Sequence, residues 1–452
     1  MTVTKEFTYR RIPSPRPPAP EVNKLLAEDR SAHDWFRFVL SFPPHLVGEY
    51  LRNFGIGAGQ TVLDPFCGTG TTVVECKKSG VFGVGLEINP VAHFAGKVKT
   101  DWSPEPDGLM EHARGVASAT EACLQSDGFG SNPTPALERQ NEIALRELPE
   151  ESAKLLLKNS ISPLPLHKTL VLLEQLRKQE DLRFSSHERL ALAKALVKQV
   201  GNLHFGPEVG VGPPKADAPV VALWLSNVAA MADDLRTLRR SDATPSTIIL
   251  ADARDVARVV EPNSIDAVIT SPPYPNEKDY TRTTRLESVL LGFINSKAEL
   301  QALKRGLVRS NTRGVYKGDD DDLWVAEHPE IQRIAKAIEA RRIELGKTSG
   351  FERMYGRVTK LYFGGMARHL ADLRVVLKPG AYLAYVVGDQ ASYLRVMIRT
   401  GQILADIAQS LGYELVNIDL FRTRIATATK EQLREEVVVL RWPGTPVSSG
   451  QP

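Results

Sequence analysis

Cysteine is scarce in this chain of 452 residues, which contains only three. Cys67, Cys76 and Cys123 are too few and too scattered for a disulfide framework or a zinc site, so we expect a reducing compartment. His167 and the other histidines lack metal-binding spacing as well. No run of about 18 apolar residues occurs, which argues against a membrane span, and the first twenty residues lack the apolar core of a signal peptide. These absences predict a cytoplasmic protein without a metal site.

A surplus of charge of either sign is also missing. The 57 basic and 54 acidic residues leave a formal net charge of +3. The totals therefore do not indicate a nucleic-acid binder, and any basic surface must be local. A composition of 42% hydrophobic and 25% charged residues is that of a soluble globular protein. The chain is too long for one ordinary core, so two domains or one domain with a large insertion are expected.

Strands and helices alternate in two parts of the sequence. The apolar segment TVLD precedes a loop and a helix, and the apolar segment VFGVGLEI precedes a second helix that begins near Asn89. Such near-continuous apolar strands between helices are typical of a parallel, doubly wound α/β sheet. The pattern stops near residue 101 and resumes near residue 245. The later predicted strands are STIIL, SIDAVIT, AYLAYVVGD, ELVNIDLFRTR and EEVVVLRW.

The interruptions of this pattern define the predicted organisation of the chain. Residues 101–245 are rich in Leu and Ala at helical spacing, which predicts a helical insertion. The Pro-rich start, which ends in RIPSPRPPAP, is predicted to be an extended or disordered arm. The predicted parts are an arm at 1–30, a first half of the sheet domain at 31–100, the helical insertion at 101–245, a second half at 246–445 with a smaller insertion at about 280–360, and a tail at 446–452.

A glycine-containing loop follows the first predicted strand. In TVLDPFCGTGTT, residues 61–72, Gly68 and Gly70 let the backbone approach a ligand closely because no Cβ is in the way. The loop joins a strand to a helix, which is where open α/β sheets bind ligands. Glu87 ends the next strand, and an acid there can accept hydrogen bonds from both hydroxyls of a ribose. The alternative is a plain, tight strand-to-helix turn.

Three classes of nucleotide ligand can be compared with this loop. A phosphate-binding P-loop needs a lysine after its last glycine, and none follows here. A dinucleotide fold needs a third glycine for close helix packing, but Thr71, Thr72 and Val73 follow instead. S-adenosylmethionine has a ribose and an adenine but no phosphate, and a carboxylate such as Asp64 would suit its ammonium group. The loop therefore favours S-adenosylmethionine.

A rigid elbow, SPPY, follows the predicted strand SIDAVIT. The hydroxyl of Ser271 and the carbonyl of Pro272 offer two acceptors for the two hydrogens of an exocyclic amino group. Such an amine is a poor nucleophile because its lone pair is delocalised into the ring, and two fixed acceptors can localise that lone pair. Tyr274 can stack on the base, a contact worth about 1–3 kcal/mol in single-strand binders. No basic histidine is near Ser271, so the serine is a poor candidate for a nucleophile.

The combination of DPFCGTGTT with TSPPY resembles the amino-methyltransferases of DNA, which use S-adenosylmethionine to make N4-methylcytosine or N6-methyladenine. Residues 34–100 and 245–442 carry the resemblance. It implies a seven-stranded, mostly parallel, Rossmann-like methyltransferase sheet in which the helical insertion is a candidate target-recognition region. It also implies direct transfer of the methyl group from sulfur to nitrogen, with no covalent enzyme intermediate and no metal.

The resemblance also implies roles for individual residues. The catalytic elbow would consist of Ser271, Pro272, Pro273 and Tyr274. Ile88 would pack on the adenine of the cofactor, and Asp252 would contact the adenine amino group. The other implied cofactor residues are Phe42 in the segment SFPP, and the loop with its acid: Asp64, Pro65, Phe66, Gly68, Thr69, Gly70 and Glu87.

The elbow also bears on the target base. A cytosine-C5 methyltransferase needs a Pro-Cys pair, which the Pro-Pro pair excludes, and Cys67 is interpreted as a small packed residue. In the family, serine before Pro-Pro-Tyr is commoner among N4-cytosine enzymes than among adenine enzymes, which favours cytosine. The cofactor motif precedes the elbow, an order in which target recognition lies between the two groups of motifs.

A stacked base cannot reach the elbow and must be flipped out, at a cost of roughly a few kcal/mol. Phosphate contacts should offset part of that cost. Residues 280–317 follow the elbow directly and contain eight basic and two acidic residues, so Arg282 and Arg285 are the first candidates for DNA contacts. The alternative is a solvated surface, because the run DDDD follows. The loop at 204–215 is predicted to be a packed connector, with a lid or a DNA wedge as the alternative.

Two other functions stay open. RNA and protein-glutamine amino-methyltransferases have similar elbows, usually with Asp or Asn in the first position. A catalytically idle, DNA-binding subunit of a restriction or defence complex would show a damaged elbow or cofactor loop, and neither is damaged here. The predicted partner is DNA with a flipped base, and a cognate restriction or defence complex is a further candidate.

Overall fold

The computed structural model describes residues 25–36, 42–129, 144–205, 208–276, 278–425 and 432–444. Most of the predicted arm, Ser41 of the SFPP segment and the predicted tail lie outside the described residues.

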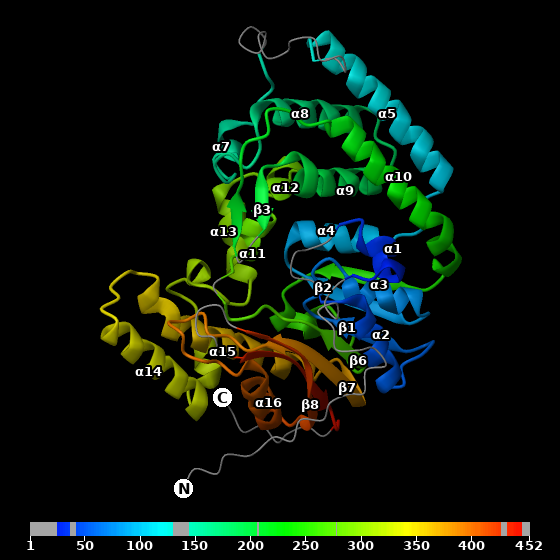
Figure 1. Cartoon of the computed structure of the whole chain (residues 1–452). Helices are drawn as coiled ribbons and strands as arrows, with labels where there is room; N and C mark the ends of the chain where they lie inside the picture. Colours follow the sequence, from blue (N-terminus) through cyan, green and yellow to red (C-terminus); the bar gives the residue numbers. More distant parts are fainter. Residues whose placement is uncertain are drawn as a thin grey trace.

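A seven-stranded sheet forms the centre of the molecule, with the strand order β5-β2-β1-β6-β7-β9-β8 (Figure 1). The first five strands of this order run parallel, and β9 is antiparallel to both of its neighbours. The prediction of a mostly parallel Rossmann-like sheet is confirmed. The strands are β1 (Thr61–Asp64), β2 (Phe82–Glu87), β5 (Ser246–Leu250), β6 (Ile265–Thr270), β7 (Leu377–Gly388), β8 (Glu414–Ile425) and β9 (Gln432–Arg441).

The strand order reverses between β1 and β6. The chain leaves β1 for β2 and β5 on one side and returns to β6 on the other side. Val62 of β1 lies opposite Ala267 of β6, and Leu63 lies opposite Val268, so the carboxyl ends of these strands are adjacent. In open α/β sheets the crevice at such a point binds ligands. The glycine loop after β1 and the elbow after β6 therefore meet at one edge of the sheet.

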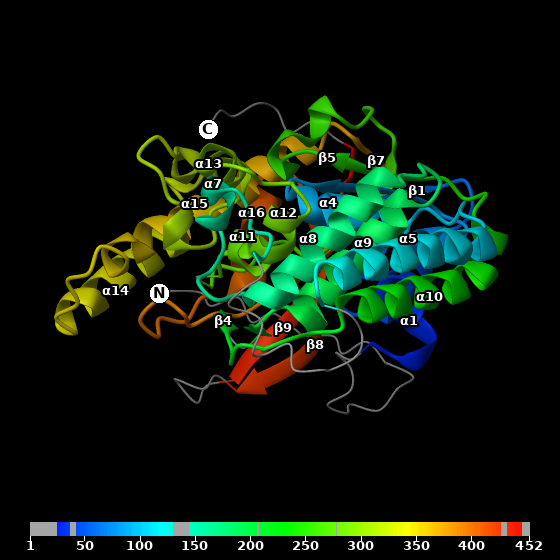
Figure 2. The ribbon, with the colours of Figure 1, turned by 90° about the horizontal axis from the view of Figure 1, so that it is seen from above.

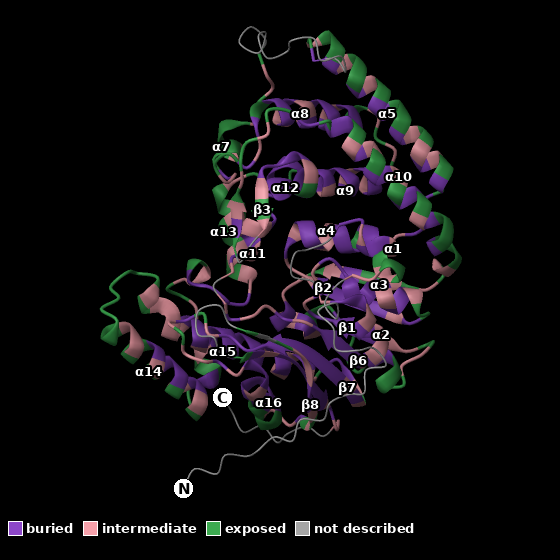
Figure 3. Cartoon of the chain, viewed as in Figure 1, coloured by how far each residue is buried: buried purple, intermediate pink, exposed green. Residues whose placement is uncertain are grey.

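Helices cover both faces of the sheet. Side chains alternate along β1, so Val62 packs in a cluster with α2 whereas Leu63 packs on the opposite face, in a cluster with α15 and α16. The inner strands β1, β2, β6 and β7 are largely buried (Figure 3). The helices next to the sheet are α2 (Pro44–Asn53), α3 (Thr71–Lys78), α4 (Pro90–Lys99), α15 (Tyr355–Leu373) and α16 (Thr400–Ser410).

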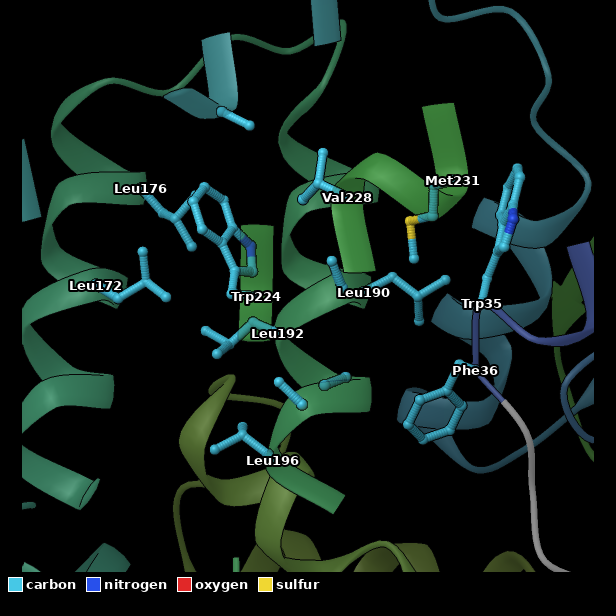
Figure 4. Close-up of a cluster of buried hydrophobic side chains, with 14 of the residues drawn as sticks. Trp35, Phe36, Leu172, Leu176, Leu190, Leu192, Leu196, Trp224, Val228 and Met231 are labelled. Carbon is cyan, nitrogen blue, oxygen red and sulfur yellow. The ribbon is translucent and has the colours of Figure 1, made fainter. Parts of the chain in front are cut away.

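The residues predicted as a helical insertion form a layered bundle beside the sheet (Figure 1). Its apolar core also includes residues of α4, so the bundle is joined to the sheet domain by packing. Figure 4 shows Trp224 among leucines of neighbouring helices, and its indole Nε1 donates to the carbonyl of Glu188 at 2.9 Å. The helices of this region are α5 (Pro106–Ser126), α7 (Glu150–Ala153), α8 (Pro163–Lys178), α9 (Ser185–Ala195) and α10 (Val220–Leu238).

A short hairpin occupies part of the segment that the sequence predicts to be a connector. Strands β3 (Leu203–Phe205) and β4 (Val209–Val211) are antiparallel. Strands of three residues are too short for a periodic pattern, so composition indicated only a connecting loop. The base of the hairpin is fixed by Asn202, whose side-chain carbonyl accepts from the backbone N–H of Lys215 at 3.0 Å.

The segment between β6 and α15 contains the second set of inserted helices. They are α11 (Tyr280–Thr283), α12 (Arg285–Leu290), α13 (Lys297–Gly306) and α14 (Pro329–Glu344). Helix α14 projects from the body of the molecule in two perpendicular views (Figures 1 and 2). The remaining short helical pieces are η1 (Ala27–Asp29), α1 (Arg30–His33), η2 (Leu196–Val200), η3 (Arg239–Ser241), η4 (Ala253–Arg258), η5 (Thr312–Gly314), η6 (Asp321–Val325) and η7 (Glu352–Met354).

Candidate active site

The glycine loop turns sharply between β1 and α3. Gly68 has a φ of 53° and Gly70 a φ of 84°, both in the left-handed region that side chains disfavour. A Cβ on Gly70 would lie 3.3 Å from the Cα of Gly96 and 3.3 Å from Cδ1 of Ile248. Gly70 therefore allows both the turn and the close approach of α4 to the loop.

We expect Gly70→Ala to destabilise the protein by about 2 kcal/mol. The left-handed backbone alone costs a residue with a Cβ about 1–2 kcal/mol, and the contact with Gly96 and Ile248 adds to that cost. Gly59→Ala is a matched control because Gly59 has a φ of 83° but no atom within 4 Å of its would-be Cβ. Urea unfolding should show a larger loss for Gly70→Ala than for Gly59→Ala. Equal losses of stability in the two variants would show that the close approach of α4 does not require glycine at position 70.

The acid at the end of β2 reaches back to the glycine loop. Glu87 accepts from the backbone N–H of Gly68 at 2.9 Å and from that of Asn89 at 2.7 Å. Burial raises the pKa of Glu87 to about 7, although these two hydrogen bonds pull the pKa down. The carboxyl group is thus held beside the loop by two backbone donors, in the position where the sequence predicted a ribose acceptor.

Asp64 lies at the end of β1 and is fully buried. Its Oδ1 accepts from the hydroxyl of Thr270 at 2.5 Å and from the backbone N–H of Phe66 at 3.1 Å. Its Oδ2 is buried and has no hydrogen-bond partner among the described residues. Burial raises the pKa of Asp64 to about 6. A buried acceptor without a donor is costly, so this oxygen suits a ligand that brings a donor or a positive charge.

The structure brings the elbow to the glycine loop. Thr270, which donates to Asp64, is the residue directly before Ser271. On the other side of the loop, the hydroxyl of Thr72 donates to the carbonyl of Ile269 at 3.0 Å. Two side-chain hydrogen bonds therefore join the end of β6 to the glycine loop and to the first turn of α3.

Within the elbow, the hydroxyl of Ser271 donates to the carbonyl of Val386 on β7 at 3.1 Å. This bond uses the proton of the hydroxyl and leaves lone pairs of the oxygen as acceptors. The ring of Tyr274 lies against β7, because a Cβ on Gly388 would be only 3.1 Å from Cε2 of that ring. Burial raises the pKa of Tyr274 above its ordinary value. Pro272 is buried, and Pro273 is half-buried.

The predicted adenine side of the site contains a charge network. Asp252 accepts from Nη2 of Arg254 at 2.6 Å and from the backbone N–H of Arg254 at 2.9 Å. Arg254 also donates to Asp321 at 2.5 Å and to the carbonyl of Gly306 at 3.0 Å. If Asp252 contacted the adenine, its carboxylate would have to accept hydrogen bonds from both the adenine and Arg254. The predicted packing residue Ile88 lies against Gly306. A Cβ added to Gly306 would be 2.2 Å from Cδ1 of Ile88.

The other predicted cofactor residues lie around the loop. Thr69 is buried, and its hydroxyl accepts from Nζ of Lys99 at 3.4 Å. The ring of Phe66 meets that of His369 edge-on, with centroids 4.9 Å apart. Pro65 is buried, and Phe42 packs at the edge of the cluster that contains α2.

The two arginines predicted to contact DNA differ in their surroundings. Arg285 is buried, and its guanidinium donates to the carbonyl of Thr281 at 3.2 Å and to that of Leu155 at 3.1 Å. A DNA contact by Arg285 would require these bonds to break. Arg282 is half-buried, and its Nε has no hydrogen-bond partner in the described part of the chain. Because this Nε is itself buried, the DNA contact of Arg282 stays a prediction.

Several residues that shape the site were not predicted from the sequence. Thr270 stands inside the motif TSPPY and Arg254 lies two residues after Asp252, so their positions were a usable signal. His369 had no such signal. Its Nδ1 is 2.7 Å from the carbonyl of Ala253, its Nε2 is 2.7 Å from the hydroxyl of Tyr385, and burial lowers its pKa to about 4. His369 is therefore neutral, and its ring packs edge-on against the ring of Phe66 in the glycine loop.

The strand order, the glycine loop with its acid, and the adjoining Pro-Pro elbow define a methyltransferase of Rossmann-like fold. In the described residues no helix is long and apolar enough to cross a membrane. The same residues contain no group of three or more His, Cys, Asp and Glu side chains that could hold a metal ion.

Comparisons with known proteins specify the class further. Residues 20–95 match the family model described as DNA methylase, of the N6/N4 amino-methyltransferase type. The Type II methyltransferase M.BsoBI of Geobacillus stearothermophilus is 25% identical over 448 residues, covering 92% of this chain and 85% of that protein. The Type II methyltransferase M.AvaI of Anabaena variabilis is 23% identical over 446 residues, covering 92% and 87%. The chain is a relative of the DNA amino-methyltransferases, and the resemblance seen in its motifs is confirmed.

A search of solved structures gives a weaker likeness. TrmN from Thermus thermophilus aligns with a TM-score of 0.32 and 10% identity, covering 91% of this chain and 52% of that chain. A TM-score at this level carries no argument about fold, which is defined here by the strand order.

Proposed function

We propose that this protein transfers a methyl group from S-adenosylmethionine to the exocyclic amino group of a base in DNA, with cytosine N4 as the favoured target. The match to the DNA methylase model and the Type II methyltransferases M.BsoBI and M.AvaI support DNA as the substrate. Serine as the first residue of the elbow supports cytosine. We also propose that the protein acts in the cytoplasm, with a cognate restriction or defence complex as a further candidate partner.

The orientation of the Ser271 hydroxyl is the observation that carries this proposal. Because its proton is donated to Val386, its oxygen keeps a lone pair for one hydrogen of an amino group, beside the hydrogen bond that it shares with Tyr274. The neighbouring Thr270 is bonded to Asp64, so this acceptor stands close to the glycine loop. An acceptor that is fixed beforehand needs no reorganisation when the reaction begins.

The residues of the loop fit S-adenosylmethionine. The unpartnered Oδ2 of Asp64 suits the ammonium of its methionine part, and the carboxyl group of Glu87 suits its ribose hydroxyls. The turn at Gly68 and Gly70 keeps side chains away from the ligand. When bound, S-adenosylmethionine supplies a methyl group on a positively charged sulfur, which is the electrophile that an amine requires.

The chain's own residues would act by positioning. Tyr274 would stack on the flipped base, while Ser271 and the carbonyl of Pro272 would each accept one amino hydrogen. These two bonds would turn the nitrogen lone pair out of conjugation and toward the cofactor site. With the amine held in this way, bound S-adenosylmethionine would supply the methyl group, and the proton that the nitrogen gives up would leave to solvent. No step in this account uses an enzyme nucleophile.

The test is to map modified bases in DNA from cells that lack their own methyltransferases and express the protein. We expect N4-methylcytosine at one short recognition sequence, read by a method that distinguishes it from N6-methyladenine. N6-methyladenine at a single site would correct the base and keep the reaction class. Purified protein that labels RNA or protein, but not DNA, with tritiated cofactor would refute DNA as the substrate.

A further inference from the structure

An exposed apolar tip ends the helical hairpin formed by α14 and α15. Residues 343–351, which comprise the end of α14 and most of the connection to α15, are all exposed. Three of them are large and apolar: Ile343 is 64% exposed, Leu345 is 43% exposed and Phe351 is 57% exposed. Scattered apolar residues on a surface are ordinary, but a projecting tip with three of them within nine residues indicates a contact surface.

The topology places this tip at the same edge of the sheet as the elbow. Helix α15 ends at Leu373, just before β7 begins at Leu377, so the two elements run in opposite directions. The first turn of α15 therefore lies where β7 ends, and the ring of Tyr274 packs at that end of β7. The rings of Tyr355, at the start of α15, and Tyr393, just after β7, have centroids 5.0 Å apart, which agrees with this placement.

Direct contacts connect the start of α15, next to the tip, to the segment after the elbow. The hydroxyl of Tyr393 donates to the carbonyl of Ser310 at 2.8 Å. The side-chain amide of the next residue, Asn311, donates to the carbonyl of Lys278 at 3.0 Å. Arg357, in the first turn of α15, donates to the carbonyl of Asp319 at 3.0 Å. The hairpin is thus anchored within a few side chains of Tyr274.

The charge of the hairpin suits a polyanion. Residues 330–360 contain eight basic and four acidic residues, a net charge of +4. Most of the acids pair within their own helix, as Glu344 does with Arg341 and Glu339 with Arg342. Arg353 is exposed, and its backbone N–H donates to the carbonyl of Ser349 at 3.3 Å, whereas its guanidinium has no hydrogen bond or ion pair within the described residues. Lys347 is also exposed, with its Nζ 3.8 Å from Glu352.

We propose that the α14–α15 tip binds the DNA duplex that flanks the target base. Arg353 and Lys347 contact phosphates, and Phe351 with Ile343 rests on sugars or base edges in a groove. Proteins that bend or open DNA combine cations with apolar side chains in this way. This surface rests on the proposed function, because it requires that the duplex be seated at the elbow.

The test compares duplex binding by the native chain, the double variant Lys347→Gln/Arg353→Gln and the variant Phe351→Ala. Fluorescence anisotropy with a labelled duplex of about 30 base pairs should show roughly tenfold weaker binding for the double variant. Its slope of log K against log salt should fall by about 1.8, or about 0.9 for each lost phosphate contact. Phe351→Ala should weaken binding roughly threefold to fivefold without a change in slope. Calorimetric affinity for S-adenosylhomocysteine should be unchanged in both.

The matched control is Arg258→Gln/Val259→Ala, which removes an exposed cation and an exposed apolar side chain at the end of η4, outside the α14–α15 hairpin. It should bind DNA as the native chain does. Equal affinities and slopes in the tip variants and the native chain would overturn the proposal. So would a native dimer that Phe351→Ala converts to a monomer at unchanged DNA affinity, because the tip would then be a protein interface. Failure of the native chain to bind any duplex would instead refute the proposed function.

Discussion

Ser271→Ala should reduce methyl transfer to DNA about 100-fold or more, while affinity for the cofactor stays within about twofold of the native value. The alanine removes the acceptor that Val386 orients, and loss of one fixed hydrogen-bonding group at a reacting centre costs about this much. The glycine loop keeps its own contacts, because Asp64 is bonded to Thr270 and not to Ser271. Transfer of a tritiated methyl group and calorimetric titration of the cofactor would measure the two effects separately.

Ser264→Ala is the matched control for this substitution. Ser264 also donates its hydroxyl to a carbonyl, that of Glu261 at 2.6 Å, but it lies at the opposite end of β6. Its loss should leave transfer unchanged. At the other side of the elbow, Tyr274→Ala should weaken transfer roughly fivefold to 150-fold, the equivalent of about 1–3 kcal/mol of stacking, and Tyr274→Phe should keep most of it. Normal transfer by Ser271→Ala would remove the elbow from the chemistry.

The strands of the sheet could be predicted from the sequence because the apolar pattern that indicates each strand lies within a few consecutive residues. TVLD, VFGVGLEI and SIDAVIT are largely apolar, as strands buried on both faces must be. The start of helix α4 could be predicted in the same way. Asn89 caps α4 by accepting from the backbone N–H of Val91 at 3.1 Å, with Pro90 at the first position. Local rules of this kind do not depend on partners distant in sequence.

Contacts between distant segments could not be predicted in the same way. Asp252 and Arg285 were chosen from motifs and chain proximity, but their surroundings depend on folding. Arg254 donates to both Asp252 and Asp321, which are 69 positions apart in the sequence. Arg285 donates to the carbonyl of Leu155 in the helical region. Motifs locate such residues on the chain, whereas their partners are set by tertiary packing. The roles predicted for Asp252 and Arg285 stay predictions.

Glu87→Gln should weaken cofactor binding roughly tenfold to 100-fold. A charged acceptor contributes about 1.5–3 kcal/mol to a hydrogen bond, and the amide can accept at one atom only. Because glutamine has the same shape, its carbonyl can still accept from Gly68 or Asn89, so the loop should keep its conformation. Calorimetric titration with S-adenosylhomocysteine at pH 8 gives the affinities, and thermal unfolding checks the fold.

The pH dependence of cofactor binding gives a second, independent measure of Glu87. Burial raises the pKa of Glu87 to about 7 and that of Asp64 to about 6, above their ordinary values of 4.5 and 3.8. The folded, ligand-free protein therefore holds these protons more tightly than the unfolded chain. The stability that the neutral carboxyls contribute is full below their ordinary pKa values and is lost as the pH rises through 6 and 7. A cofactor that needs carboxylates must displace the protons, so its affinity should fall as the pH drops below 7.

The native affinity should fall about tenfold per pH unit below 7 and more steeply below 6, where Asp64 also takes up a proton. In Glu87→Gln the fall should begin about one unit lower, because only Asp64 remains. Asp419→Asn is the control. Burial raises the pKa of Asp419 to about 6 too, but Asp419 lies on β8, five strands away from β2. Its loss should leave the profile unchanged. An affinity that is constant from pH 6 to 8 in the native chain would show that neither Glu87 nor Asp64 binds the cofactor as a carboxylate.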